Sequence, residues 1–343
     1  MSDPRTESYR QSAADDLSRI LDSYPLPEMT GKRIFLTGAT GFIGHWLLMA
    51  IARLNALGAG ITVVALSRNP RRFLERHPEF GRTGWLDFVP GDVRDYPFPS
   101  GQFDLFIHGA SDTSPEAAGR ALELFETMVL GTRHVLRHVR ASGARRILIL
   151  SSGAVYGEQP AEMSHIPETA GYGCDSADPA DAYGEGKRAM EMLAVCHGRE
   201  YGIEPVIARC FAFIGYGLPS HLAVGQLIKG AMMDGRILIE GDGKVVRSYL
   251  YAADLAVWLL ALACRGRAGT AYNVGSDEDF RLDLLAERIC DTLGLDRRVK
   301  VLGQNQSMQR VRYIPDVSRI RQELRVEVWT EIETGIKRMA ACL

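Results

Sequence analysis

The chain has 343 residues, of which 46% are hydrophobic and 24% charged, a composition typical of a globular protein and unlike disordered, collagen-like or fibrous chains. The 40 lysines and arginines against 42 acidic residues leave a formal net charge of −2, which excludes the broad basic surface that holds a nucleic acid. The 35 glycines, about one residue in ten against a usual share of about 7%, indicate many tight turns or loops where backbone approaches a ligand.

Targeting and redox signals are weak along the whole sequence. The longest apolar run, residues 257–264, falls far short of the roughly 20 residues that a membrane span needs. The N-terminal residues lack the apolar stretch of a secretory signal. The six cysteines are scattered without a CxxC pair. We therefore expect a cytoplasmic protein with reduced thiols, no membrane contact and no bound metal.

Residues 1–30 form a separate N-terminal piece. Leu17, Ile20 and Leu21 recur at helical spacing and predict a short helix over 15–21, which the following Pro25 and Pro27 stop. We expect a helical arm packed on the main body.

From residue 31 onward, short apolar strands alternate with helices, which predicts a doubly wound, Rossmann-type parallel sheet covered on both faces. After residue 213 this rhythm breaks, and glycines and turns dominate 215–243. We expect a dinucleotide-binding domain at 31–213, with 245–275 returning to it, and a smaller α/β region in 214–343 that mainly binds substrate. The predicted strands are 33–37, 61–66, 103–108, 146–150 and 205–208, and the predicted helices are 42–57, 116–140, 182–201, 253–264 and 282–293.

A glycine loop lies between the first predicted strand and the first predicted helix of this domain. Gly38, Gly41 and Gly44 can provide a tight turn, a close approach of backbone to a pyrophosphate, and close packing of helix on strand. A phosphate would then lie at the helix N-terminus, where free N–H groups point. The residues expected to bind the dinucleotide here are Gly38, Thr40, Gly41, Phe42, Ile43 and Gly44.

The end of the second strand discriminates between the two nicotinamide cofactors. An acid there would bind the ribose hydroxyl of NAD, but this chain has Ser67 and Arg68, which favours NADP(H) and leaves NAD(H) possible. The alternative is that Arg68 is a solvated residue near a helix start. Asp92 and Val93 follow the third strand, where they either face the adenine or form a simple turn.

Three further residues form a candidate catalytic set. Tyr183 and Lys187 are four residues apart on a predicted helix and therefore share a face. A nearby ammonium lowers a phenol's pKa, so we expect Tyr183 to exchange a proton with a substrate oxygen while a hydride moves to or from the nicotinamide. Ser152 follows the strand that ends at Leu150 and can orient the same oxygen. Ser111, in a loop after the fourth strand, is expected to face the nicotinamide or the substrate.

These motifs together resemble the extended short-chain dehydrogenase/reductases, and more narrowly the nucleotide-sugar epimerase/dehydratase family, from about residue 31 to 324. The resemblance implies that Tyr183 is the acid/base, Lys187 its tuner and a ribose ligand, and Ser152 its partner. It also implies a nucleotide-diphosphate sugar as substrate, held in part by Arg247, and a homodimer through a four-helix bundle of the helices 116–140 and 183–201.

Three positions depart from the family pattern and reduce the number of reactions that the chain could catalyse. Gly153 and Ala154 stand where 4,6-dehydratases carry an acidic pair and decarboxylases a glutamate, and Ala212 stands where many relatives have an asparagine for the pyrophosphate. Hydride transfer does not need the missing acidic residues, so the sequence favours a C4 ketoreductase or epimerase. A dehydratase or decarboxylase that uses another acid, and a non-catalytic NADP(H) sensor, remain as alternatives.

Overall fold

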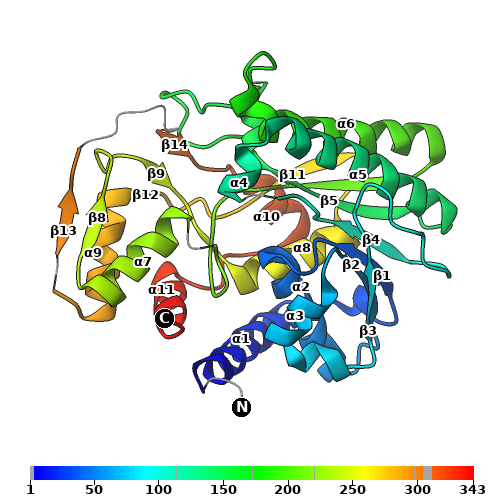
Figure 1. The fold of residues 1–343 in the computed structure, drawn as a ribbon, viewed down its shortest axis with the longest axis horizontal. Helices are drawn as coiled ribbons and strands as arrows, with labels where there is room; N and C mark the ends of the chain where they lie inside the picture. Colours follow the sequence, from blue (N-terminus) through cyan, green and yellow to red (C-terminus); the bar gives the residue numbers. More distant parts are fainter. Residues whose placement is uncertain (1–3, 113, 172, 220, 297, 304–310) are drawn as a thin grey trace.

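The computed structural model describes residues 4–112, 114–171, 173–219, 221–296, 298–303 and 311–343. Its centre is a seven-stranded sheet in the order β11-β6-β5-β4-β1-β2-β3, in which every neighbouring pair is parallel (Figure 1). The order reverses beside β1, which is the doubly wound arrangement, and the predicted fold class is confirmed. The strands are β1 (Arg33–Thr37), β2 (Thr62–Ser67), β3 (Leu86–Pro90), β4 (Leu105–His108), β5 (Arg146–Ser152), β6 (Glu204–Cys210) and β11 (Thr270–Val274).

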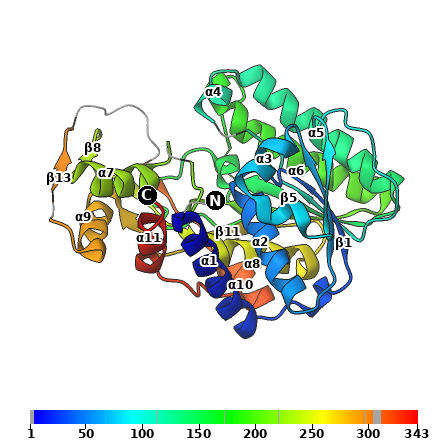
Figure 2. The same cartoon turned by 60° about the horizontal axis from the view of Figure 1, so that its bottom comes forward.

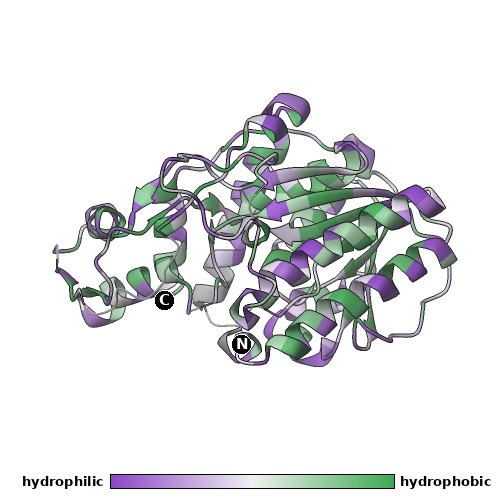
Figure 3. Cartoon of the chain, turned by 90° about the horizontal axis from the view of Figure 1, so that it is seen from above, coloured by the Kyte–Doolittle hydropathy of each residue, from purple (hydrophilic) through white to green (hydrophobic). Residues whose placement is uncertain are grey.

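Helices cover both faces of this sheet (Figure 1). The pair α5 (Ala121–Ala141) and α6 (Ala182–Tyr201) packs on one face, and the pair α2 (Phe42–Ala56) and α8 (Ala252–Arg265) on the other. The short helices α3 (Pro70–Arg76) and α4 (Pro115–Ala118) follow β2 and β4. Coloured by hydropathy, the strands of the sheet are mostly hydrophobic, and the helices alternate between hydrophobic and hydrophilic residues (Figure 3).

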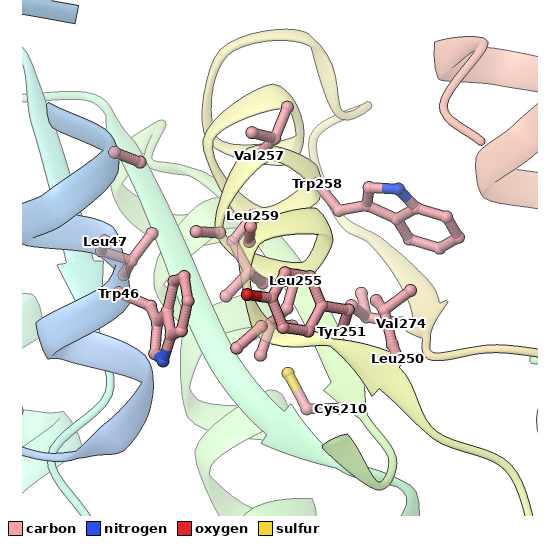
Figure 4. Close-up of a cluster of buried hydrophobic side chains, with 14 of the residues drawn as sticks. Trp46, Leu47, Cys210, Leu250, Tyr251, Leu255, Val257, Trp258, Leu259 and Val274 are labelled. Atoms are coloured by element: carbon pink, nitrogen blue, oxygen red, sulfur yellow. The ribbon is translucent and has the colours of Figure 1, made fainter. Parts of the chain in front are cut away.

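Helix α8 is almost completely buried, since its residues from 252 to 263 are all enclosed. A helix that is apolar all round must be enclosed, and α8 lies between the sheet and the helices α1 (Pro4–Ser23) and α2. Trp46, Leu255 and Leu259 pack there around the buried Tyr251 (Figure 4). Burial of each such side chain contributes about 1.5–3 kcal/mol, so this layer fixes the face of the sheet opposite α5 and α6.

The N-terminal arm is a longer helix than the sequence predicted. Helix α1 spans Pro4–Ser23 and ends just before Pro25. Leu17 and Ile20 are buried against the body of the protein. The carboxylate of Asp16 accepts hydrogen bonds from Arg338, at 3.0 and 3.1 Å, so the arm also contacts helix α11 (Ile332–Ala340) (Figure 2).

The region after residue 213 forms small sheets and further helices beside the carboxyl end of the main sheet (Figure 1). The expectation that turns dominate 215–243 was wrong, because α7 (Ala223–Asp234) occupies the middle of that stretch. Val224, Leu227, Ile228 and Ala231 recur at helical spacing and are buried; the glycines around them obscured the pattern. The other elements here are β7 (Phe213–Ile214), β8 (Ile237–Ile239), β9 (Val246–Arg247), β10 (Leu250–Tyr251), β12 (Phe280–Arg281), α9 (Leu282–Leu293), β13 (Val299–Val301), β14 (Arg312–Tyr313), α10 (Ser318–Leu324) and α11 (Ile332–Ala340).

Candidate functional site

The glycine loop joins β1 to α2 in a conformation that only glycine can adopt at two of its positions. Gly38 has φ +77°, and a Cβ there would lie 2.6 Å from the carbonyl carbon of Gly109. A Cβ on Gly44 would overlap the Gly38 carbonyl and the Ala39 backbone, so Gly44 lets the helix pack against the turn. Gly41 precedes the first helical residue in an extended conformation. The loop therefore presents a helix N-terminus and bare backbone at the carboxyl edge of the sheet, which suits a phosphate.

A pocket of about 1090 Å³ opens at this edge. Its described lining combines the glycine loop, the ends of β2 and β4, the start of α6, and the loop after β7. Arg247 is not part of that lining; it lies on β9, opposite Tyr313 of β14. The pocket brings together all the other candidate catalytic and binding residues: Gly38, Thr40, Gly41, Phe42, Ile43, Gly44, Ser67, Arg68, Asp92, Val93, Ser111, Ser152, Tyr183 and Lys187.

A side pocket of about 300 Å³ continues from the end of β2. Asn69 accepts a hydrogen bond from the backbone N–H of Arg72 at 3.0 Å and thereby caps helix α3. Arg72 and Arg76 are one turn apart on that helix and line the side pocket with Arg68. The described lining contains no carboxylate, so the side pocket is a cationic hollow beside the glycine loop.

Asp92 lies on the same side of the main pocket and is already engaged. Its carboxylate accepts two hydrogen bonds from the Arg94 guanidinium, at 2.8 and 3.0 Å. These bonds hold the pKa of Asp92 below its ordinary value, against the opposing effect of burial. Asp92 therefore presents a charge that is largely neutralised by its neighbour.

Tyr183, Lys187 and Ser152 meet in the main pocket, but not with the electrostatics expected from the sequence. The Lys187 ammonium donates to the carbonyl of Leu150 at 2.8 Å and to the Ser111 hydroxyl at 3.2 Å, and burial lowers its pKa to about 8. Burial raises the pKa of Tyr183, and a hydrogen bond with Ser152 only partly opposes that rise. The expectation that Lys187 lowers the Tyr183 pKa was therefore wrong for the chain alone, because burial dominates and the lysine is directed to other acceptors.

A buried ionic network that the sequence analysis missed supports the strand carrying Ser152. Glu191 of α6 accepts a hydrogen bond from Ser151 at 2.5 Å and two from Arg209 of β6, at 3.0 and 2.7 Å. Arg209 also donates to the Tyr156 hydroxyl at 2.9 Å. The network joins α6, β5 and β6 at Ser151, the residue next to Ser152. The serine that precedes Ser152 was the available signal, since a buried hydroxyl requires a partner.

One cluster among the described residues has the composition of a metal site. Ligand atoms of His45, His77 and Glu79 lie within 4.8 Å of one another beside the side pocket. The Arg10 guanidinium, however, pairs with Glu79 at 2.8 Å. The two imidazole rings are in contact, with centroids 4.1 Å apart and planes tilted by 42°. A cation would have to displace the guanidinium, so we interpret the cluster as a packing contact among the arm, α2 and the end of α3.

Within the part of the chain that the structure describes, no helix has both the length and the hydropathy needed to cross a membrane.

A family model described as "NAD dependent epimerase/dehydratase family" matches residues 34–275, which cover all the catalytic candidates and most of the pocket. Among curated proteins, UDP-glucuronic acid decarboxylase 6 of Arabidopsis thaliana is 27% identical over 318 residues, covering 90% of this chain and 88% of that protein.

A second plant protein, the trifunctional UDP-glucose 4,6-dehydratase/UDP-4-keto-6-deoxy-D-glucose 3,5-epimerase/UDP-4-keto-L-rhamnose-reductase RHM2 of Arabidopsis thaliana, is 28% identical over 318 residues. The match covers 90% of this chain but only 46% of that protein, so the chain spans about half the length of this relative. Among solved structures, dTDP-glucose 4,6-dehydratase from Streptomyces venezuelae with NAD and TYD bound has a TM-score of 0.76 at 23% identity, covering 90% of this chain and 96% of that one. This likeness shows that the fold is shared.

Proposed function

Because the chain belongs to the NAD dependent epimerase/dehydratase family, we propose that it transfers a hydride at C4 of a nucleotide-diphosphate sugar, as a ketoreductase or an epimerase. The observation that carries this proposal is the meeting of Ser152, Tyr183 and Lys187 in one pocket with the glycine loop, while Gly153 and Ala154 offer no acid. Hydride transfer needs only one proton relay, whereas elimination of water or loss of carbon dioxide needs a further acid or base.

The described residues fit a nicotinamide dinucleotide. The N-terminus of α2, at Gly41, can bind the pyrophosphate. Lys187 lines the same pocket and donates a hydrogen bond to Ser111. A bound nicotinamide would supply or accept the hydride. We propose that Lys187 holds the adjoining ribose, that Ser152 orients the sugar oxygen, and that Tyr183 gives or takes the proton of that oxygen.

We further propose that NADP(H) is the preferred form of the cofactor. Support comes from the side pocket, in which Arg68, Arg72 and Arg76 gather where the end of β2 would meet the adenosine ribose. A guanidinium binds phosphate oxygens through two parallel hydrogen bonds, whereas a ribose hydroxyl gains little from three positive charges.

The substrate side of the pocket is proposed to come mainly from residues 214–343. Leu218, Pro219, His221 and Leu222, in the loop before α7, line the pocket. For Arg247 we propose contact with the nucleotide diphosphate, although it lies outside the described lining. That contact requires the Arg247 side chain to reach into the pocket from β9, beside Tyr313, whose ring packs on the pocket residue Phe211.

The test is direct. Purified protein is incubated with NADPH and UDP- or dTDP-4-keto-6-deoxyglucose, and the oxidation of NADPH is followed by absorbance. We expect consumption of NADPH by the wild type and a loss of roughly 100-fold or more in the Tyr183→Phe variant, since the proton relay is removed. Interconversion of UDP-glucose and UDP-galactose without added cofactor would select the epimerase instead. Equal rates for wild type and Tyr183→Phe would refute both forms of the proposal.

The curated relatives favour a second candidate, a 4,6-dehydratase or a UDP-glucuronate decarboxylase, because both activities appear in their names. Such an activity would require a group other than residues 153 and 154 to move the extra proton. Release of carbon dioxide from UDP-glucuronate, or formation of a 4-keto-6-deoxy sugar from UDP- or dTDP-glucose, would establish it.

We also propose a homodimer in which α5 and α6 of two copies form a four-helix bundle. Several large apolar side chains on these helices are exposed, which supports a partner there. They are Leu122 and Leu130 on α5, and Met192 and Tyr201 on α6.

A further inference from the structure

The N-terminal helix α1 lies outside residues 34–275, the stretch that the family model matches, yet it contacts two segments that line the pockets. It packs along α2 and α8 (Figure 2). Two consecutive residues of α1 contact different parts of the body. Tyr9 contacts the loop after β7, and Arg10 contacts the turn η2 (Pro78–Arg82), which follows α3.

The Tyr9 ring supports the loop from which Leu218 and Leu222 enter the main pocket. It is 4% exposed and stacks on Tyr216, with ring centroids 3.5 Å apart and planes 25° from parallel. The indole N–H of Trp46 donates to the main-chain carbonyl of Tyr216 at 3.1 Å. Tyr216 is therefore held by its ring and by its backbone, two residues before Leu218, which lines the pocket.

Arg10 is linked through Glu79 to the side pocket. Its guanidinium pairs with one carboxylate oxygen of Glu79 at 2.8 Å, and the other oxygen lies 3.5 Å from Nδ1 of His77. Burial would raise the pKa of Glu79, but the hydrogen bond with His77 and the Arg10 charge lower it overall. His77 itself lines the side pocket beside Arg76. The ion pair therefore joins the end of α3 to the arm.

The buried face of α1 fixes where these two contacts are made. Leu17 and Ile20 follow Tyr9 on that face at helical spacing and are buried. On the same face, the carboxylate of Asp16 accepts a hydrogen bond from the buried Tyr251 hydroxyl at 3.0 Å. Because the helix is anchored two turns beyond Tyr9, its first turns hold the loop after β7 and the end of α3 at a set separation.

We propose that α1 is a positioning element of the pocket. Tyr9 holds Leu218 and Leu222 where they bind the nucleotide sugar, and Arg10 holds His77 and the end of α3 where they bind the cofactor. Neither Tyr9 nor Arg10 belongs to the described lining of either pocket, so both act through the residues that they contact. The inference rests on the proposed function, because it takes NADPH and a nucleotide-diphosphate sugar as the ligands.

Steady-state kinetics of the full chain test the Tyr9 contact, with whichever of UDP- or dTDP-4-keto-6-deoxyglucose or UDP-glucose the wild type converts. We expect Tyr9→Ala to raise KM for that sugar about 3- to 10-fold, the effect of one aromatic pair, because the loop loses its support. The value of kcat should change by less than about twofold, since the reacting groups are untouched. Tyr9→Phe keeps the ring and should retain the KM of the wild type.

Leu17→Ala is the matched control for Tyr9→Ala. It removes a buried side chain from the same helix and should lower the melting temperature of the protein, but KM should stay at the wild-type value. A general loss of stability lowers the amount of folded enzyme and leaves its KM unchanged, so the two variants distinguish positioning from stability. A KM for Tyr9→Ala equal to that of the wild type would overturn the role of Tyr9.

The same contact is tested from its other side. Tyr216→Ala should raise KM as Tyr9→Ala does, and the double variant should be no worse than either single one, because both substitutions remove one contact. Independent, additive effects on the logarithm of KM would overturn the coupling of arm and loop. If Tyr9→Ala does not fold, as judged by thermal unfolding, Tyr216→Ala decides alone.

NADPH binding tests the Arg10 contact. Arg10→Gln should raise the Kd for NADPH, measured by fluorescence quenching, about 3- to 10-fold, since the end of α3 loses a charge-assisted hydrogen bond to the arm. Arg10→Lys keeps the charge and should lie closer to the wild type. Arg19→Gln is the matched control, because Arg19 of the same helix donates to Trp329 and Thr330, neither of which lines a pocket. Equal constants for wild type and Arg10→Gln would overturn the role of Arg10.

The outcomes separate the inference from the function on which it rests. If the wild type binds NADPH and converts a nucleotide sugar, and Tyr9→Ala, Tyr216→Ala and Arg10→Gln keep both constants, the inference about α1 is overturned while the proposed function stands. If the wild type neither binds NADPH nor converts any of the three nucleotide sugars, the proposed function is itself overturned.

Discussion

Lys187 donates a hydrogen bond to the main-chain carbonyl of Leu150 across 2.8 Å. Leu150 lies two residues before Ser152 on β5, so this bond anchors the face of α6 that carries Tyr183 to the strand that carries Ser152. It also keeps a lysine in a fully enclosed place, where burial lowers its pKa to about 8.

This lowered pKa predicts an alkaline limit to activity. Lys187 is an ammonium below pH 8 and loses its charge above it, so we expect kcat/KM to fall as the pH rises through about 8. The Lys187→Met variant should lose roughly 100-fold in kcat/KM at pH 7, and its residual activity should no longer decline at that pH. A pH–rate profile measures both effects. Lys229→Met, on the exposed face of α7, should behave as wild type; persistence of the decline in Lys187→Met would assign it to another group.

The cationic side pocket predicts a selective loss of NADPH affinity. Arg72→Ala removes a guanidinium from that pocket, and we expect the Kd for NADPH to rise about 10- to 100-fold, as for a charge-assisted hydrogen bond, while the Kd for NADH changes little. Quenching of protein fluorescence by each cofactor gives the two constants. Arg71→Ala is the matched control, because Arg71 is 90% exposed and pairs with Glu75. A parallel rise in both constants for Arg72→Ala would show that the pocket does not read the 2′-phosphate.

The buried carboxyl of Asp254 leads us to expect that the free energy of unfolding falls as the pH rises. Its carboxyl is fully buried in α8 and accepts hydrogen bonds from the backbone of Trp329 and Thr330, and burial raises its pKa to about 7. The folded state keeps the proton up to that pH, whereas the unfolded chain releases it near the ordinary value of 3.8. Between these values the folded state binds more protons, so each rise of one pH unit lowers the free energy of unfolding by on the order of 1 kcal/mol.

The measurement compares wild type with Asp254→Asn, which keeps an oxygen acceptor and cannot ionise. The difference in unfolding free energy between the two proteins, from urea titrations at pH 5, 6, 7 and 8, should shift in favour of the variant up to about pH 7 and then level off. Asp296→Asn, at a side chain 85% exposed, should give a constant difference. A constant difference for Asp254→Asn as well would contradict the raised pKa.

The exposed apolar side chains of α5 and α6 predict the state of association. Wild type should elute as a dimer in size-exclusion chromatography with light scattering, and Leu130→Glu combined with Met192→Glu should elute as a monomer, because buried unpaired charges oppose association. Leu57→Glu, at an exposed leucine just after α2, should leave the dimer intact. A monomeric wild type at micromolar concentration would exclude the proposed bundle.

The features that the sequence predicted are local ones. The strand, glycine loop and helix around Gly38 follow each other within a few residues, and the spacing of Tyr183 and Lys187 already places them on one helix face. The contacts that it did not predict join distant segments: Glu191 receives Arg209 from another strand, and Tyr313 reaches Gly153 through the pairing of β14 with β9. The direction of the Tyr183 pKa shift was predicted wrongly, because it depends on how deeply the fold buries the phenol. The spacing of residues along a helix does not specify that burial.

The position of α1 has a consequence for the order of events during synthesis. This helix leaves the ribosome before the elements on which it packs: its apolar face contacts α8, and Asp16 pairs with Arg338 of α11. At 5–20 residues per second, the partners of Leu17 and Ile20 appear on the order of tens of seconds later. The nascent chain therefore carries an uncovered apolar helix while the sheet is being made. Chaperones that bind such surfaces have a defined interval in which to act, and it closes only when the last helices have been released.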